Sequence, residues 1–492
     1  MSYRSLCVLL LSAVVSVFSQ TDPARLAAWT ITADDCRQRV TTLADGRFGG
    51  RGTGDSEFIA AARYIAAEFQ RAGLKPLDAD SSYFQRFAVD RNRIAANPFL
   101  ELLTPIASPV GSDTLRMPLR LQDDFLPAAS SAPCTLNAPL VFAGYGIRSP
   151  EHGWDDLADI DLQGAVALVL DGTPLLPDAH FDRSFRGRRK LRFLADAGAR
   201  AALLVGEPIG GISSRQSVPA ATISAAAADL LLAGSGWTLA ALRDSMQQRP
   251  RKVSMALPHR VHLQIASELA AEQQTMNIVG YLPGSDPKLR HEAIVIGAHA
   301  DHIGQIGDAV FTGANDNASG TAVVMELAEA FAALPQAPKR SIVFMAFTGE
   351  EMGLLGSRFA VENPLWPVAQ TRVMINLDMV GSGTDGMMIV GGNNYPELLD
   401  LFRRASAAHE QVPVLDRWTA ANSDHFPFHE KGIPAIFIYA LGGVSTYHTP
   451  RDRPETLDAE VMERIGRLTF QVVLDLANRN KVDLEMIPNP QP

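Results

Sequence analysis

The chain has 492 residues, of which 47% are hydrophobic and 20% are charged, and its formal net charge is −10. This composition is that of ordinary globular proteins and excludes a disordered chain, a collagen and a coiled coil. An acidic chain with one short basic cluster also lacks the charge pattern of a nucleic-acid-binding protein. The length predicts two or three domains.

The first 19 residues have the pattern of a signal peptide. Arg4 precedes an apolar run from Leu6 to Phe18, and residues 17–19 loosely resemble a cleavage site. The run is shorter than the ~20 residues that a membrane-spanning helix needs, and no later stretch reaches that length. We therefore expect an exported protein, secreted or periplasmic, whose mature chain has no stable membrane span.

Removal of this segment leaves two cysteines, Cys36 and Cys134. Export permits a disulfide between them, but two free thiols fit the sequence equally well. Because cysteines are so few, a thiolate-rich zinc site is excluded. Any metal must bind mainly to His, Asp and Glu side chains.

Residues 24–112 begin with helical periodicity, which is clearest over residues 58–69. The glycine-rich segment 49–54 before it is expected to be a flexible loop. It lacks the lysine and the preceding strand of a phosphate-binding loop.

Residues 113–262 read as a separate module, because short apolar runs bounded by Gly and Asp alternate with polar segments. This module contains no cluster of His, Asp and Glu. Its predicted strands are Pro139–Tyr145, Ala165–Leu170, Ala201–Val205 and Val218–Ile223.

Residues 265–492 alternate between predicted strands and helices such as 319–334, which implies a mostly parallel sheet covered on both faces. Ligands of such sheets bind beyond the carboxyl ends of the strands. The predicted strands are Ala293–Ala298, Ser341–Phe347, Val373–Leu377, Met387–Val390 and Ala435–Ile438.

Polar side chains gather at these ends of the strands. Four groups follow a predicted strand and the fifth precedes a helix. They are His299-Ala300-Asp301-His302, Glu350-Glu351, Asp378, Tyr447-His448-Thr449-Pro450 and, before the helix, Asp316.

Two imidazoles and several carboxylates suit borderline divalent metals, above all zinc. Five ligands are too many for one tetrahedral zinc with an open position, but they fit two metals that share a carboxylate. One further carboxylate must then act as general base, and the adjacent Glu350 and Glu351 can divide these two roles. Taken singly, Asp316 could be a helix N-cap and Asp378 a turn cap. The joint arrangement favours the metal site.

A serine hydrolase is disfavoured, because no Gly-x-Ser-x-Gly elbow occurs.

Five motifs occur along the chain in the order in which the secreted zinc exopeptidases have them, and the chain resembles that family. The motifs are His-x-Asp, Gly-Ala-x-Asp-Asn-Ala-Ser-Gly, Glu-Glu-x-Gly-Leu-x-Gly-Ser, Asn-x-Asp-Met and Tyr-His-Thr-Pro-x-Asp. This family includes bacterial leucyl aminopeptidase, aminopeptidase Y and glutamate carboxypeptidase. The resemblance implies an α/β fold with a mostly parallel central sheet and helices on both faces. It also implies an inserted, smaller, β-rich α/β protease-associated domain. The expected division is a signal peptide over 1–19, a peptidase domain in two parts, 24–112 and 265–492, and the insert over 113–262.

The resemblance also assigns roles to the residues and implies two zinc ions per chain. Metal ligands would be His299, Asp316, Glu351, Asp378 and His448, with Asp316 bridging the two ions. Glu350 would be the general base that activates a metal-bridging hydroxide for attack on the peptide carbonyl. Asp301 would orient His299. A cis peptide bond between Asp316 and Asn317 is also expected.

An aminopeptidase acting on peptides is the first expectation, and several alternatives stay open. A carboxypeptidase or dipeptidase of the same family would need a cationic pocket, for which Arg417, Arg451 and Arg453 are candidates. A glutaminyl cyclase or a non-catalytic binding protein is less favoured, because all five ligands are present.

Three further side chains near the motifs carry weaker expectations. The family pattern gives His302 no ligand role, and His425 is expected to line the substrate cleft. Tyr447 either hydrogen-bonds near the reacting group or packs beside His448.

Overall fold

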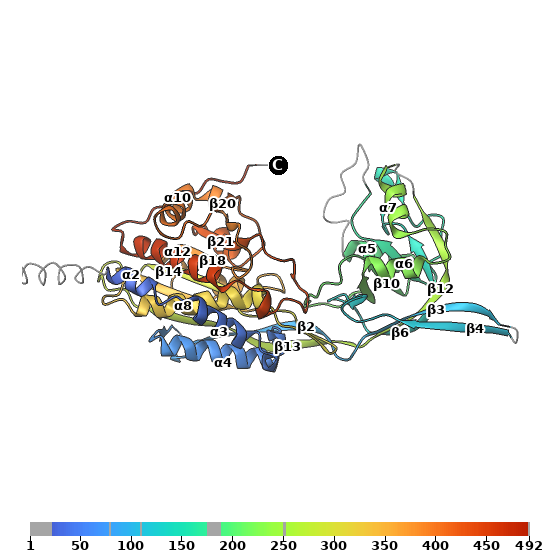
Figure 1. Ribbon diagram of the computed structural model, residues 1–492, viewed down its shortest axis with the longest axis horizontal. Helices are drawn as coiled ribbons and strands as arrows, with labels where there is room; N and C mark the ends of the chain where they lie inside the picture. The colour runs from blue at the N-terminus through green and yellow to red at the C-terminus, as the bar shows by residue number, and fades with distance from the viewer. Residues whose placement is uncertain (1–21, 78–79, 109–110, 175–187, 249–251, 491–492) are drawn as a thin grey trace, which may run out of the picture.

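The computed structural model describes residues 22–77, 80–108, 111–174, 188–248 and 252–490. The expected signal peptide lies outside these residues. Figure 1 shows two modules, each built on its own sheet, that are joined by two long strands. Among the described residues, no helix combines the length and apolar character needed to cross a membrane.

The larger sheet has nine strands, and its four central strands run parallel, in the order β17-β14-β18-β21. This is the mixed α/β sheet that the alternating sequence pattern predicts. The edges depart from it, because β13 pairs antiparallel with β17, and β19 pairs antiparallel with β21. The strands are β1 (Lys75–Pro76), β2 (Phe84–Ile94), β13 (Ser267–Leu282), β14 (Ala293–His299), β17 (Ser341–Phe347), β18 (Thr371–Leu377), β19 (Gly386–Val390), β20 (Val414–Arg417) and β21 (Ala435–Leu441).

Helices cover both faces of this sheet. Along β14, Ile294 and Ile296 pack into one apolar cluster and Val295 into another, because successive side chains of a strand point to opposite faces. The helices that contribute buried residues to the first cluster are α2 (Pro23–Ala28), α3 (Ala33–Leu43), α4 (Ser56–Arg71), α8 (Gly320–Ala332), α10 (Pro396–Ala405) and α12 (Ala459–Asn478). The second receives α9 (Leu355–Glu362) and α11 (His425–Glu430).

The smaller module has an eight-stranded mixed sheet with its own apolar core. This sheet begins at Phe99, earlier than residue 113, because β3 pairs with both β4 and β12. Its strands are β3 (Phe99–Ser108), β4 (Gly111–Pro118), β5 (Phe125–Pro127), β6 (Cys134–Ala143), β9 (Val166–Leu170), β10 (Ala201–Val205), β11 (Ala220–Ile223) and β12 (Ser254–Ile265). Its helices are α5 (Arg188–Asp196), α6 (Ala225–Leu232) and α7 (Leu239–Gln248).

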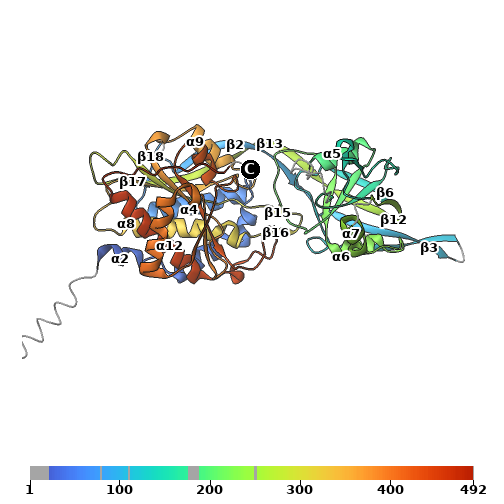
Figure 2. The ribbon, with the colours of Figure 1, turned by 90° about the horizontal axis from the view of Figure 1, so that it is seen from above.

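Strands β2 and β13 form an antiparallel ribbon that leads from the larger sheet to the smaller module, as Figures 1 and 2 show. Two further short hairpins are β7 (Arg148–Ser149) with β8 (Trp154–Asp155), and β15 (Gly304–Ile306) with β16 (Ala309–Phe311). The hairpin β15–β16 lies in the part of the chain that builds the larger module and packs its apolar side chains with Leu126 of the smaller module. The two modules therefore share a contact beside the ribbon.

The glycine-rich segment 49–54 is not the flexible loop that the sequence suggested. Gly49 and Gly50 adopt φ values of 52° and 71°, and a Cβ on Gly50 would lie 2.4 Å from the Phe311 carbonyl oxygen. This close approach buries Arg51, whose guanidinium donates hydrogen bonds to the carbonyl oxygens of Ala300 and Gly313. The segment ties the N-terminal helices to the loop that follows His299.

Cys36 lies buried in α3 and Cys134 lies in β6, and both are free thiols. The sequence left a disulfide between them open. The structure places them in separate modules without a bond.

Candidate metal centre

The side chains expected at the site lie together beyond the carboxyl ends of the central parallel strands. His299 ends β14, Glu350 and Glu351 follow β17, and Asp378 follows β18. Parallel strands end at one edge of a sheet, so residues far apart in sequence meet there.

His299 is the centre of one group. Its Nε2 lies 3.2 Å from Asp378 Oδ1 and 3.3 Å from Asp316 Oδ1. The nearest neighbour of its Nδ1 is the backbone carbonyl oxygen of Asp301, at 3.1 Å, while the Asp301 carboxylate is 3.7 Å away. The carbonyl therefore fixes which ring nitrogen faces the two carboxylates.

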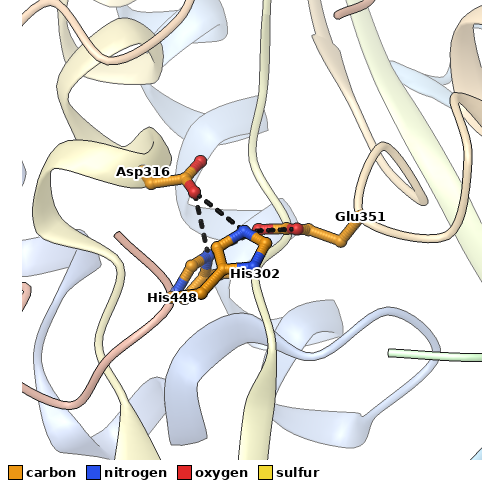
Figure 3. A group of neighbouring side chains, drawn as sticks. All are labelled: His302, Asp316, Glu351 and His448. Carbon is orange, nitrogen blue, oxygen red and sulfur yellow. Dashed lines mark hydrogen bonds and ion pairs between the residues drawn. The ribbon is translucent and has the colours of Figure 1, made fainter. Parts of the chain in front are cut away.

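His448 is the centre of the second group, which Figure 3 shows with its side chains pointing toward one another. Its Nε2 lies 3.1 Å from Asp316 Oδ2 and 2.9 Å from Glu351 Oε2. Asp316 thus faces His299 with one carboxylate oxygen and His448 with the other. A carboxylate that bridges two cations needs this arrangement.

His302 also belongs to this group, although the family pattern gave it no ligand role. Its Nδ1 lies 2.7 Å from Glu351 Oε1 and 4.0 Å from Asp316 Oδ2. The side chain is fully buried. The signal available in the sequence was its position three residues after His299 in the same loop.

The donor set fits divalent metal ions. Two groups of atoms that lie within 4.8 Å of one another are His299 with Asp316 and Asp378, and His302 with Asp316, Glu351 and His448. Asp316 Oδ2 and His448 Nε2 are buried and lie 3.1 Å apart, yet neither forms a hydrogen bond of normal geometry among the described residues. Buried polar atoms rarely go unpaired, so an ion bound between them would satisfy both.

Carboxylates dominate the electrostatics of the site. Burial alone would lower the pKa of His299, but Asp378 and Glu350 outweigh it and raise that pKa well above its ordinary value. Burial raises the pKa of Glu350 well above its ordinary value, and Glu351 and Asp378 raise it further. Asp316, Glu350, Glu351 and Asp378 thus crowd four carboxyl groups near His299, an environment that a bound cation would stabilise.

The Asp452 carboxylate fixes the backbone on which Asp316 lies. The N–H groups of Asn315 and Asp316 donate to the two carboxylate oxygens of Asp452, at 2.8 and 3.0 Å. The peptide bond between Asp316 and Asn317 is cis, as the resemblance implied. Asp316 is not the N-cap of α8, because Ser319 holds that position and the Gly320 N–H donates to Asn317 Oδ1. Asp452 ends the Tyr-His-Thr-Pro-x-Asp motif, and only the structure shows what it does.

The acidic residues next to the site are also fixed. Asp301 is fully buried and accepts a hydrogen bond from Thr53 Oγ1 at 2.6 Å. Asp378 accepts one from Ser423 Oγ at 2.7 Å.

Other residues singled out in the sequence lie differently. His425 is fully buried with its Nε2 3.1 Å from Thr419 Oγ1, so the structure does not support a place on the cleft surface. The Tyr447 ring stacks on the His448 ring with centroids 3.7 Å apart, which agrees with packing. Arg417 lies over the Tyr439 ring, and Arg453 donates to the Pro450 carbonyl oxygen.

Comparisons with known proteins agree on this part of the chain. Residues 277–473, which contain every residue of the site, match the model of peptidase family M28. Within curated proteins, aminopeptidase YwaD of Bacillus subtilis is 33% identical over 227 residues, 42% of this chain and 46% of that protein. A probable leucine aminopeptidase of Arthroderma otae is 29% identical over 236 residues, 44% of this chain and 61% of that protein. The chain thus spans about half the length of these relatives.

Solved structures share the fold over nearly the whole chain, not only over the residues that match the family model. An aminopeptidase from Aneurinibacillus sp. strain AM-1 aligns with 95% of this chain and 100% of its own, at a TM-score of 0.63 and 22% identity. A zinc aminopeptidase from Bacillus subtilis aligns with 92% of this chain and 98% of its own, also at a TM-score of 0.63 and 22% identity. The chain therefore has the fold of these proteins.

Proposed function

We propose that this protein is a zinc-dependent aminopeptidase that removes N-terminal residues from peptides. The M28 match, the names of the relatives and the donor set at the strand ends support this function. The observation that carries it is the position of Asp316, whose two carboxylate oxygens face His299 and His448.

In this proposal two zinc ions bind per chain, with Asp316 as the shared ligand. His299 and Asp378 complete one site, and Glu351 and His448 complete the other. A zinc pair, when bound, supplies Lewis-acid chemistry that lowers the pKa of water and stabilises negative charge on the peptide carbonyl oxygen.

Glu350 is the proposed general base. It follows β17 directly before the ligand Glu351, and its backbone N–H lies 3.4 Å from Asp301 Oδ1. Its carboxylate takes a proton from the attacking water and gives it to the leaving amine. Asp301 keeps this turn and the His299 loop in register through Thr53 and the Glu350 N–H.

The remaining expectations are part of the same proposal. Residues 1–19 direct export, so the mature enzyme acts outside the cytoplasm or in the periplasm. The peptidase domain is built from both ends of the chain, and the smaller module between them is a protease-associated domain.

The test uses the mature protein loaded with zinc and a peptide that begins with leucine, with products followed by mass spectrometry. Stepwise loss from the amino end, abolished by a chelator and by N-terminal acetylation of the peptide, is the expected result. Glu350→Gln is the matched control, because it keeps the volume and removes the base. It should bind two zinc ions and lower kcat by about 10²–10⁴-fold. Loss of residues from the carboxyl end would refute the proposal.

A further inference from the structure

A pocket of about 870 Å³ lies between β2, β13, α9 and the loop that joins β10 to β11. This β10–β11 loop, residues 206–219, belongs to the smaller module. Ligand pockets in proteins have a similar volume and are mostly apolar. Its apolar lining residues include Phe87, Val89, Leu269 and Phe359, and charged side chains, among them Arg215, Arg358 and Glu362, stand beside them.

The α9 wall of the pocket is continuous with the turn that carries the proposed general base. The backbone N–H of Leu355 donates to the Gly349 carbonyl oxygen at 2.9 Å, and that of Leu354 donates to the Glu350 carbonyl oxygen at 3.0 Å. Leu355, the first residue of α9, is therefore hydrogen-bonded to the turn that contains Glu350.

The opposite wall reaches the metal centre as well. In the β10–β11 loop, the Gly210 N–H donates to the His448 carbonyl oxygen at 2.7 Å. Farther along the same loop, Asn92 of β2 donates its backbone N–H to the Ser213 carbonyl oxygen at 2.7 Å. The loop thus runs from a candidate metal ligand to the edge of the pocket.

We propose that this pocket binds the side chain of the substrate residue that follows the scissile bond, and that it favours a large apolar or aromatic side chain. This inference rests on the proposed aminopeptidase function. Glu350 must reach the leaving amine to protonate it, so the leaving residue lies on the Glu350 side of the centre. There the chain enters α9 and the pocket begins.

The chemistry of the pocket wall selects the class of side chain. The rings of Phe87 and Phe359 stack with centroids 4.8 Å apart and an interplanar angle of 19°, and both are half-buried. Their open surfaces give an aromatic or branched side chain an apolar platform. Leu269 on the rim is 44% exposed, so apolar surface there is left for a substrate to cover.

The test compares kcat/KM for the tripeptides Leu-Gly-Gly and Leu-Phe-Gly, which differ only in the residue after the scissile bond. We expect the wild-type protein to prefer the phenylalanine peptide by about tenfold. Phe359→Ala should bring the two values within about threefold. Phe359→Leu, which keeps an apolar side chain in the wall, should give an intermediate ratio and serves if the alanine variant does not fold.

Tyr64→Ala is the control variant. It removes a half-buried ring from α4, which packs on the opposite face of the sheet, and it should keep the wild-type ratio. Equal kcat/KM values for the two peptides in the wild type, or an unchanged ratio in both Phe359 variants, would overturn the pocket assignment. A wild-type protein that cleaves neither peptide would instead refute the proposed function, so the two failures are distinguishable.

Discussion

Replacing Gly210 with alanine should disturb the metal centre from the smaller module. A Cβ at this position would lie 2.6 Å from Phe311 Cε1, about 1 Å closer than the ~3.5–4.0 Å at which carbon atoms pack. Phe311 is fully buried in a cluster with Ile303 and Leu126, so its ring has no free space to turn into. The β10–β11 loop must move instead, and overpacking of this kind costs about 1–3 kcal/mol.

The same movement affects His448. A shift of about 1 Å lengthens the 2.7 Å hydrogen bond from the Gly210 N–H to the His448 carbonyl oxygen beyond the range in which it contributes. Such a bond is worth about 1 kcal/mol, which corresponds to roughly fivefold in an equilibrium constant. We therefore expect zinc to bind at least fivefold more weakly at the site that contains His448, and kcat/KM to fall by about 10²-fold or less.

The assay is a zinc titration against a chromogenic chelator, with kcat/KM measured on the same samples. Gly211→Ala is the matched control, because its Cβ would lie 3.4 Å from the Ala129 Cβ, an ordinary contact. The reasoning fails if Gly210→Ala and Gly211→Ala have the same zinc affinity and the same kcat/KM.

Three other substitutions test separate parts of the structure. Asp316→Asn should lower the zinc content of the purified protein, because one amide cannot replace a carboxylate that faces two imidazoles. Atomic emission measures the zinc content, and two zinc ions per chain in this variant would contradict the assignment of Asp316 as the shared ligand. His302→Leu should weaken zinc binding by about 10–100-fold, because the hydrogen bond to Glu351 is lost. His302→Asn should restore most of the zinc affinity, because its amide N–H can still donate to Glu351. Equal zinc affinities of the two variants would show that His302 does not position Glu351. Arg51→Met should lower the Tm by several degrees, because it leaves buried carbonyl oxygens unpaired at a cost of about 1–3 kcal/mol each. Arg47→Met is the control, and it should leave the Tm nearly unchanged because the Arg47 side chain is 61% exposed. A similar Tm for both arginine variants would refute the structural role of Arg51.

The strands of both modules were predictable where the apolar runs were short and bounded by turn residues. Ser341–Phe347 and Ala201–Val205 have in the structure the bounds that the sequence predicted. The ribbon of β2 and β13 was not predicted. Both strands mix charged and apolar residues, because much of their surface lies outside the apolar cores, so no buried run marks them.

The candidate site was predictable as a set of residues, because chemistry requires particular side chains at the ends of particular strands. His299, Glu350 and Asp378 follow apolar runs whose strand character the sequence makes plain. Because these strands run parallel, their carboxyl ends lie at the same edge of the sheet, and the three side chains meet there.

Contacts between distant segments depended on the tertiary structure alone. The sequence of residues 49–54 is equally compatible with a flexible loop, and only the approach of Gly50 to the Phe311 carbonyl oxygen shows why Arg51 is buried. In the same way, nothing in the local sequence places Gly210 of the smaller module against His448. The sequence by itself determined the strands and the candidate metal ligands, since both depend on local pattern and residue chemistry. The walls around the site were decided by packing between segments, which local pattern does not encode.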